Sequence, residues 1–360
     1  MASAHPERRS GWPRRRWLQA GAALALGQAL PAWAQQPSPD RPQPITDSAG
    51  RPVPAPARVQ RIFPAGPPAA IAVYTLAPDA LLGWPRANRP EEIEFLLPGV
   101  GSRPEIGRLT GRGNSANLET VIGLQPDLIV DTGSVRPTFV ELADRVQAQT
   151  RIPYALLDGR LDAVPESYRI LGRLTGRTVR AEALARYAET TLRTVRERVA
   201  RVPREQRPRV YFARGPLGLE TGLGGSINVE MFDAMGLGHV AQGLQGGLAR
   251  VPLEQVLAWD PQVIITIDQT FAQTVRNNPL WRSVSAVKNG RVHLSPKLPF
   301  GWVDFPPGVN RLPGLWWIGQ KVLPAQFPED LRTIARDFYR LFYQVDLSPA
   351  QVQRVLAGRD

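Results

Sequence analysis

Arginine and aromatic side chains follow several predicted strands of this 360-residue chain. Arg86 comes just after segment 80–84, and Arg214 directly follows segment 209–213. Because open parallel sheets bind ligands beyond the carboxyl ends of their strands, we expect these side chains at one site. Guanidinium groups pair with carboxylates or catecholates, and aromatic rings cover apolar surface. The predicted ligand is therefore anionic with apolar parts. Its predicted contacts are Arg86, Arg112, Arg214 and Arg311 as anion donors, Trp302 as apolar cover, and Asp304 as an acceptor or arginine positioner.

The histidine and cysteine content argues against a site for a bare metal ion. The chain has no cysteine and three histidines, of which His239 and His293 lie in the predicted folded part. Zinc and manganese sites without cysteine usually need several histidines together with carboxylates. A metal would therefore arrive already chelated. We expect no metal ligands, no resident cofactor and no catalytic activity.

The elements that position these side chains are indicated by a thirteen-residue pattern that occurs twice, 135 positions apart. The copies start at Leu118-Glu119 and at Leu253-Glu254, and five of their positions are identical. Each copy predicts a short amphipathic helix, a proline that ends it, and a buried strand. The spacing is that of a small domain rather than of a solenoid unit, so we expect a duplicated lobe.

The alternation of strands and helices predicts an α/β fold with two Rossmann-like lobes joined by one long rigid α-helix. The expected N-terminal lobe spans residues 58–178, the linker helix 179–203 and the C-terminal lobe 204–360. Residues 35–57 form a lead-in segment with a small hairpin about Ala49-Gly50. Mostly parallel sheets are expected in both lobes.

Residues 1–34 have the features of an export signal. Arg14-Arg15-Arg16-Trp17 precedes a short apolar run, and Ala32-Trp33-Ala34 provides a small-x-small cleavage site. The basic start resembles a twin-arginine signal, and a general secretory signal is the alternative. We expect cleavage near Ala34 and a periplasmic protein without a lipid-bearing cysteine. The net charge is +12, but the arginines are scattered, so nucleic acid is not an expected partner.

One pattern favours a different class of protein. Gly111-x-Gly113-x-x-Ala116 has the spacing of a dinucleotide-binding loop, and Asp131 follows where an acid would bind the ribose. An exported nucleotide-dependent oxidoreductase is therefore an alternative. The preceding segment is a poor buried strand and the following helix is short, so the spacing alone is a weak signal.

The motifs together resemble the periplasmic substrate-binding proteins of iron-siderophore and vitamin B12 ABC importers. The likeness rests on Asn117-Leu118-Glu119, the strand 126–130, the second copy at Leu253-Glu254 and the leading segment 46–53, and it covers about residues 45–345. In that family, two α/β lobes joined by a long helix hold a chelated metal or a corrinoid between them. The resemblance implies that this chain captures a metal chelate, with a ferric siderophore as the first candidate.

The resemblance also implies a partner. Glu119 and Glu254 match the family's two lobe-tip glutamates, which dock onto arginines of the membrane permease; alternatively, each acid only supports its helix N-terminus. The protein is expected to act as a monomer. A corrinoid or haem receptor on the same fold is a further alternative, because Tyr74, Tyr154 and Tyr211 leave a tyrosine-ligated haem open.

Overall fold

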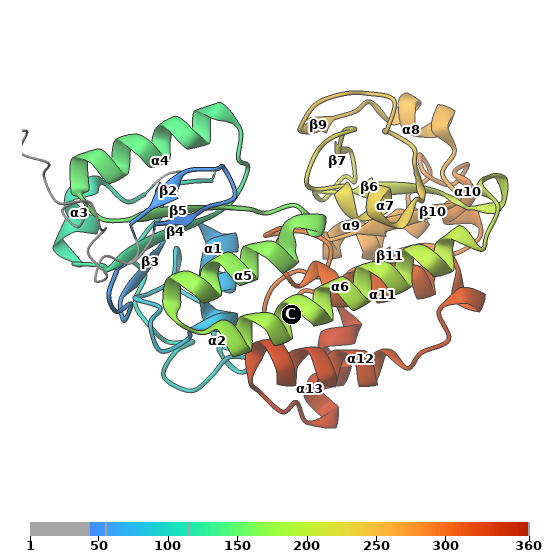
Figure 1. The fold of residues 1–360 in the computed structure, drawn as a ribbon. Coiled ribbons are helices and arrows are strands. Elements are labelled where there is room, and N and C mark those ends of the chain that lie inside the picture. The colour runs from blue at the N-terminus through green and yellow to red at the C-terminus, as the bar shows by residue number, and fades with distance from the viewer. Residues whose placement is uncertain (1–43, 55, 112, 114, 359–360) are drawn as a thin grey trace, which may run out of the picture. The chain divides into compact units, whose positions relative to one another are not determined.

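The computed structural model describes residues 44–358 apart from positions 55, 112 and 114. The chain from Pro42 to Asp360 forms one compact unit that contains two parallel sheets with helices between them (Figure 1). The predicted signal segment, 1–34, lies outside the described residues. No helix in the described part of the chain is long and apolar enough to cross a membrane.

The N-terminal sheet has three parallel strands in the order β3 (Ile62–Pro64), β4 (Leu128–Gly133) and β5 (Tyr154–Asp158). Most of their side chains are buried, as in a sheet covered on both faces. The covering elements are α1 (Pro67–Leu76), α2 (Pro90–Ile93), α3 (Leu118–Gly123), α4 (Pro137–Thr150), the 3₁₀ turn η2 (Leu161–Ala163) and α5 (Val164–Thr175).

The predicted strand 80–84 is present only as two bridging residues. Leu81 pairs with Ile62, whereas Trp84 pairs with Glu105, so the segment changes partner at Gly83. Gly83 lies against the neighbouring backbone, since a Cβ there would be 2.5 Å from a carbonyl oxygen. A continuous strand therefore does not form.

The predicted hairpin forms from β1 (Ile45–Thr46) and β2 (Pro52–Val53), which pair antiparallel. One carboxylate oxygen of Asp47 accepts hydrogen bonds from the backbone N–H groups of Ala49 and Arg51, each 3.0 Å long. These bonds close the turn. The other oxygen accepts from the N–H of Leu156 at 3.0 Å, so the hairpin is fixed to the edge of β5.

The C-terminal sheet has four parallel strands in the order β11 (Val292–Leu294), β10 (Val263–Thr266), β6 (Arg209–Ala213) and β8 (Gly238–His239). A small antiparallel pair, β7 (Glu220–Gly222) and β9 (Leu248–Arg250), lies beside it. The helices are α7 (Glu230–Met235), α8 (Leu253–Trp259), α9 (Gln269–Thr274), α10 (Ser285–Lys288), α11 (Arg311–Val322), α12 (Leu331–Phe338), the π-helix η6 (Tyr339–Tyr343) and α13 (Pro349–Ala357), with 3₁₀ turns at Arg204–Gln206, Val275–Asn277 and Pro324–Gln326. Two parallel sheets with covering helices confirm the predicted α/β class.

The longest helix, α6 (Thr178–Ala200), lies in the chain between the two sheets. Leu184, Ala188, Leu192 and Val195 are buried at helical spacing, whereas Glu182 faces outward and pairs with arginines. The buried stripe explains why this arginine-rich segment folds as an amphipathic helix. It packs against α5 and α11.

Both copies of the thirteen-residue pattern form the predicted helix, turn and buried strand. The first copy builds α3 and β4, and the second builds α8 and β10. The residue before the proline is left-handed in each copy, with φ of 46° at Gln125 and 40° at Asp260. The duplication therefore extends to the backbone of the turn.

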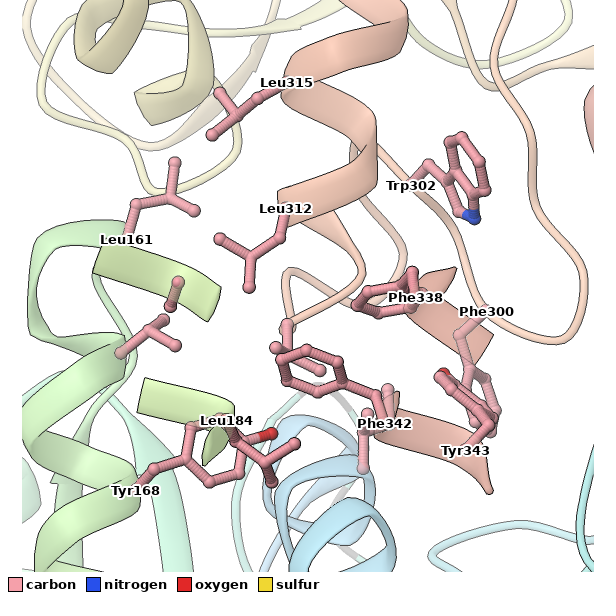
Figure 2. Packing of buried hydrophobic residues seen from close by; sticks show 14 of the residues in the cluster. Leu161, Tyr168, Leu184, Phe300, Trp302, Leu312, Leu315, Phe338, Phe342 and Tyr343 are labelled. Carbon is pink, nitrogen blue, oxygen red and sulfur yellow. The ribbon is translucent and has the colours of Figure 1, made fainter. Parts of the chain in front are cut away.

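The core is shared between the two halves of the compact unit. Leu161 and Tyr168 come from the N-terminal half, and they pack in one buried cluster with Leu312 of α11 and Phe342 of η6 (Figure 2). Arg180 adds polar links, because its guanidinium donates to carbonyl oxygens of both halves, among them those of Thr75 at 2.6 Å and Leu341 at 3.0 Å. The C-terminal helices thus pack against N-terminal elements as well as their own sheet.

Candidate functional site

The carboxyl ends of two N-terminal strands meet a segment from the C-terminal half. Thr132 of β4 and Gly159 after β5 line a small cavity together with Gly308, Val309 and Arg311. The cavity has about 30 Å³ of space for the centres of water molecules, which is enough for ordered water. A chelate is far larger, so this cavity marks where the loops converge rather than where a chelate would fit.

The converging segment of the C-terminal half is the junction segment, residues 297–310. It joins β11 to α11 and is held by close backbone packing. A Cβ on Gly301 would lie 1.8 Å from the carbonyl oxygen of Asp304, and one on Gly314 of α11 would lie 1.9 Å from that of Trp302. Asn310 also donates to the carbonyl of Phe300 at 3.1 Å. The segment is thus a well-packed loop rather than a loose one.

The structure brings two of the predicted site residues, Arg214 and Asp304, into contact. Their side chains form an ion pair, and Arg214 also pairs with Glu220 at 2.7 Å. Asp304 is buried and accepts further hydrogen bonds from the side chain of Asn228, at 2.9 and 3.0 Å, and from the backbone N–H of Phe305, at 2.7 Å. Asp304 therefore holds the side chain of Arg214 in place.

Phe305 follows Asp304 and was not singled out from the sequence. Its side chain is 72% exposed, although the residues around it are mostly buried. Its φ is +68°, which a bulky residue rarely adopts. Such backbone conformations persist only where the surroundings impose them, and they cluster at binding sites. An exposed aromatic ring on a well-packed loop is a ready contact surface for a ligand.

Arg311 lies at the junction between the halves rather than in solvent. It is 1% exposed and forms an ion pair with Glu230 of α7 at 2.8 Å. It also donates to the carbonyl oxygens of Gly159 at 2.5 Å and Gly308 at 3.1 Å. Burial lowers the pKa of Arg311, and the carboxylate of Glu230 opposes that shift. All three guanidinium nitrogens thus have protein partners.

Trp302 is fully buried in the core, so in this structure its ring offers no surface to a ligand. Its indole N–H points to the hydroxyl of Tyr339 at 3.4 Å. Figure 2 shows it on the side of α11 opposite Leu161. Sequence reasoning could not separate a buried anchor from a ligand contact here, because both roles favour a large aromatic.

Arg86 and Arg112 are the remaining predicted contacts. Arg86 is half-exposed and binds both carboxylate oxygens of Glu92, at 2.7 and 2.8 Å. Arg112 lies outside the described residues. The engaged fork of Arg86 is therefore not free for a second carboxylate in this conformation.

Two other arginines lie at the carboxyl ends of the N-terminal strands. Arg136 follows β4 and is exposed, with the hydroxyl of Ser134 as an acceptor at 3.2 Å. Arg160 follows β5, pairs with Asp158 at 2.6 Å and is 70% exposed on its side chain. Sequence reasoning missed Arg136 because it ended the strand at Val130, three residues before the observed end at Gly133.

The dinucleotide-binding alternative lacks its structural context. The described residues from 107 to 117 form neither strand nor helix, and α3 has only six residues. Asp131, the expected ribose acceptor, is buried and accepts hydrogen bonds from the hydroxyls of Thr110 at 3.0 Å and Tyr154 at 3.1 Å. Burial raises the pKa of Asp131. No ribose could reach it in this arrangement.

A haem ligated by one of the three tyrosines is not supported either. Tyr74, Tyr154 and Tyr211 are fully buried, and each hydroxyl donates to a protein acceptor. Among the described residues, no group of three or more His, Cys, Asp or Glu is placed to hold a metal ion.

Glu119 and Glu254 are exposed in the first turns of α3 and α8. Figure 1 shows these two helices far apart, each beside its own sheet. Neither carboxylate takes part in a hydrogen bond or ion pair with another described residue. Both acids are thus available to a partner.

Comparison with known proteins gives one family and a set of related chains. The family described as "Periplasmic binding protein" matches residues 107–298, more than half of the 360 residues. The chain is 23% identical to the "Molybdate-binding protein MolA" of Haemophilus influenzae over 274 residues, which are 70% of this chain and 77% of that protein. It is 26% identical to the "Cobalamin-binding protein" of Halobacterium salinarum over 299 residues, 75% of each.

Among solved structures, the fold is similar to that of an "ABC transporter solute binding protein" from Sulfurospirillum deleyianum. The TM-score is 0.80 and the sequence identity is 30%, over 87% of this chain and 98% of that one. These relatives are binding proteins rather than enzymes.

Proposed function

This chain belongs to the periplasmic binding protein family, and from that membership we propose that it captures an anionic metal chelate and delivers it to the permease of an ABC importer. A ferric siderophore is the first candidate ligand. Export through the twin-arginine-type signal predicted in residues 1–34 is part of the proposal. The observation that carries it is the combination of exposed guanidinium groups and an exposed aromatic ring on loops that converge.

The cationic side of the proposed site is formed by Arg136 at the end of β4. Arg160, after β5, adds positive charge, although its guanidinium is already paired with both oxygens of Asp158. Exposed guanidinium groups grip carboxylates and catecholates through paired hydrogen bonds. Arg112 stays a predicted contact from the same lobe. A ligand that carries several such oxygens would meet more than one arginine at once.

The opposite side is formed by Phe305, with Arg214 beside it. Asp304 pairs with the side chain of Arg214 and accepts from the backbone N–H of Phe305, so one buried carboxylate holds the Arg214 side chain and the Phe305 backbone. Leu217, which is exposed in the turn after β6, adds apolar surface. Together these residues suit a ligand with one charged and one apolar face.

The docking part of the proposal assigns Glu119 and Glu254 to the permease. One exposed acid on each lobe would fix the orientation of the protein on a basic surface. Glu119→Lys with Glu254→Lys should abolish uptake while the affinity for the ligand is kept. Unchanged uptake by this double variant would remove the docking assignment.

The ligand is tested by titrating the purified protein with a panel and following its tryptophan fluorescence. The panel contains ferric catecholate, ferric hydroxamate, ferric citrate, cobalamin, haemin and molybdate. We expect quenching by a ferric siderophore and not by its iron-free form. Binding of cobalamin, haemin or molybdate alone would overturn the siderophore assignment. The broader function as a solute-binding protein would still stand, with a different ligand. Binding of a nicotinamide or flavin nucleotide in place of any chelate would favour the oxidoreductase.

Phe305 gives the proposed site its sharpest test. Phe305→Ala should raise the dissociation constant of the chelate about tenfold, because central aromatic contacts carry much of the binding energy. The ring is exposed, so thermal unfolding should be unchanged. Leu280→Ala is the matched control, since Leu280 is also exposed but lies outside the junction segment. Equal affinities for Phe305→Ala and the native protein would exclude the ring as a contact.

A further inference from the structure

Each copy of the repeat exposes one aliphatic side chain at the same position. Ile122 in α3 is 49% exposed and Leu257 in α8 is 36% exposed, and the two are 135 residues apart, as are the copies. A single exposed aliphatic residue is common and needs no explanation. Its recurrence at the equivalent position of a second lobe, where most other positions have changed, calls for one.

The exposed aliphatic residue lies beside the exposed acid in both lobes. Ile122 follows Glu119 by three positions, and Leu257 follows Glu254 by three, so each pair shares one face of its helix. Val121 and Val256, which are fully buried, anchor the other face of each helix. Both lobes thus present an acid and an apolar group together, pointing away from the core.

The orientation of each pair is fixed by an equivalent arginine in both lobes, which donates to the carbonyl oxygen of the residue before the proline. Arg61 donates to the carbonyl oxygens of Leu124 and Gln125 at the end of α3, at 2.6 and 3.1 Å. Arg209 donates to the carbonyl oxygen of Asp260 at the end of α8, at 2.8 Å.

The residue that follows the proline adds a second hydrogen bond between the turn and the same arginine. Asp127 accepts from the backbone N–H of Arg61 at 2.9 Å, and Gln262 accepts from that of Arg209 at 3.0 Å. Each helix is therefore tied to the neighbouring strand of its sheet before any partner binds, so little ordering is required on association.

We propose that Glu119 with Ile122, and Glu254 with Leu257, form two equivalent bipartite docking units. Each aliphatic side chain fills an apolar recess of the partner next to the basic residue that receives the glutamate. This inference rests on the proposed docking to an ABC permease. The partner it fits carries two equivalent sites, each a basic side chain beside an apolar recess. The apolar contact excludes water around the ion pair, as residues around an interface hot spot do.

The test uses the full exported chain and its cognate permease in nanodiscs, with association measured by surface plasmon resonance. Ile122→Ser and Leu257→Ser are each expected to weaken association about tenfold. Leu280→Ser is the matched control, because Leu280 is 64% exposed but lies outside the repeat, and it should change nothing. Raising the salt concentration should weaken association of the Ser variants and of the native protein in parallel. Glu119→Lys keeps only the ion pair of Glu254, so its association should depend less on salt.

The possible outcomes separate this inference from the proposed function. If the Ser variants bind like the native protein while Glu119→Lys and Glu254→Lys do not, the apolar contact is refuted and docking through the acids stands. If the Lys variants also bind normally, docking itself is refuted. Equal weakening by Leu280→Ser, or equal binding to nanodiscs that contain lipid alone, would show a general apolar effect and overturn the inference. Unchanged thermal unfolding of all variants excludes misfolding as the cause.

Discussion

His239 is a buried histidine without a polar partner. Its ring stacks on Phe232 at a centroid distance of 5.5 Å, and neither nitrogen has a hydrogen-bond partner in the described part of the chain. Burial lowers the pKa of His239 from 6.5 to about 4. The folded protein therefore keeps this ring neutral at pH 5, whereas the unfolded chain protonates it.

This difference predicts a loss of stability in acid. Between pH 6.5 and pH 4 the unfolded chain binds more protons at His239, so the free energy of unfolding falls as the pH falls. The loss from this residue is about 2 kcal/mol between pH 8 and pH 5. His239→Phe keeps a ring against Phe232 and removes the titration, so it should remove that part of the loss.

Urea unfolding of both proteins at pH 8 and pH 5 provides the measurement. Comparing the pH-dependent loss within each protein cancels the effect of the substitution on packing. His293, whose pKa burial also lowers to about 4, remains in both proteins and accounts for part of the residual slope. An equal loss in the two proteins would contradict the assignment to His239.

At the same scale, the sequence indicated some contacts and missed others. It placed Arg214 and Asp304 at strand ends, and the structure joins them because parallel strands of one sheet end at one edge. It named Trp302 as the apolar contact and did not single out Phe305, three residues later. Which of two neighbouring aromatics is buried depends on the path of the loop, and that path is set by backbone contacts at Gly301 and Gly314.

Gly314 shows what an element contributes to the site. It lies inside α11, where Ala is ordinarily about 1 kcal/mol more favourable than Gly. A Cβ there would lie 1.9 Å from the carbonyl oxygen of Trp302, so the junction segment would have to move. Gly314→Ala should therefore destabilise the protein by about 1–3 kcal/mol, against the helix propensity.

Chemical unfolding checks the sign as well as the size of this effect. Gly243→Ala is the control, because no atom lies within 4 Å of the added Cβ and its φ is not in the left-handed region. The control should be within about 0.5 kcal/mol of the native protein. A stabilised Gly314→Ala would mean that the junction segment yields easily and does not hold Phe305 in place.

Elements were predicted best where their pattern was complete within a few residues. The repeat gave helix, turn and strand correctly in both copies, since period and proline are local signals. The longest described helix spans Thr178–Ala200. Segment 80–84 had the composition of a strand, but its two bridging residues pair with different neighbours, and pairing is not visible in the segment itself.

At the scale of the whole molecule, the two halves are joined by contacts that local patterns do not reveal. Tyr74 of α1 packs on Tyr343 of η6 at a centroid distance of 5.4 Å and donates to its carbonyl oxygen at 3.0 Å. Arg354 of α13 pairs with Glu94, which follows α2. These partners are more than 250 residues apart in the chain. The tail of the chain therefore helps to fix the N-terminal half, a role that the sequence did not suggest.

The partly buried pair Arg311–Glu230 makes the strongest prediction about this junction. Glu230 accepts from the N–H of Leu161, and Arg311 donates to the carbonyl of Gly159, so the pair binds the N-terminal half through two backbone groups. Arg311→Met leaves an uncompensated carboxylate and should cost about 3 kcal/mol. Glu230→Gln leaves a buried guanidinium and should also be costly. The double variant should lose clearly less than the sum, with a coupling of about 1–3 kcal/mol.

The matched control is the exposed pair Arg173–Glu166, whose Arg→Met and Glu→Gln cycle should give less than about 1 kcal/mol. Urea unfolding gives the coupling, and hydrogen exchange should rise in residues 159–163 of the Arg311→Met variant, because these amides lie at the released contact. If Arg311→Met instead kept its stability and lost affinity for the chelate, Arg311 would be a ligand contact rather than a link between the halves. A large coupling between Arg311 and Glu230, together with faster exchange at 159–163 in the Arg311→Met variant, would mean that this pair joins the halves firmly in the native protein before any ligand binds. Capture of the ligand would then require little movement between the halves.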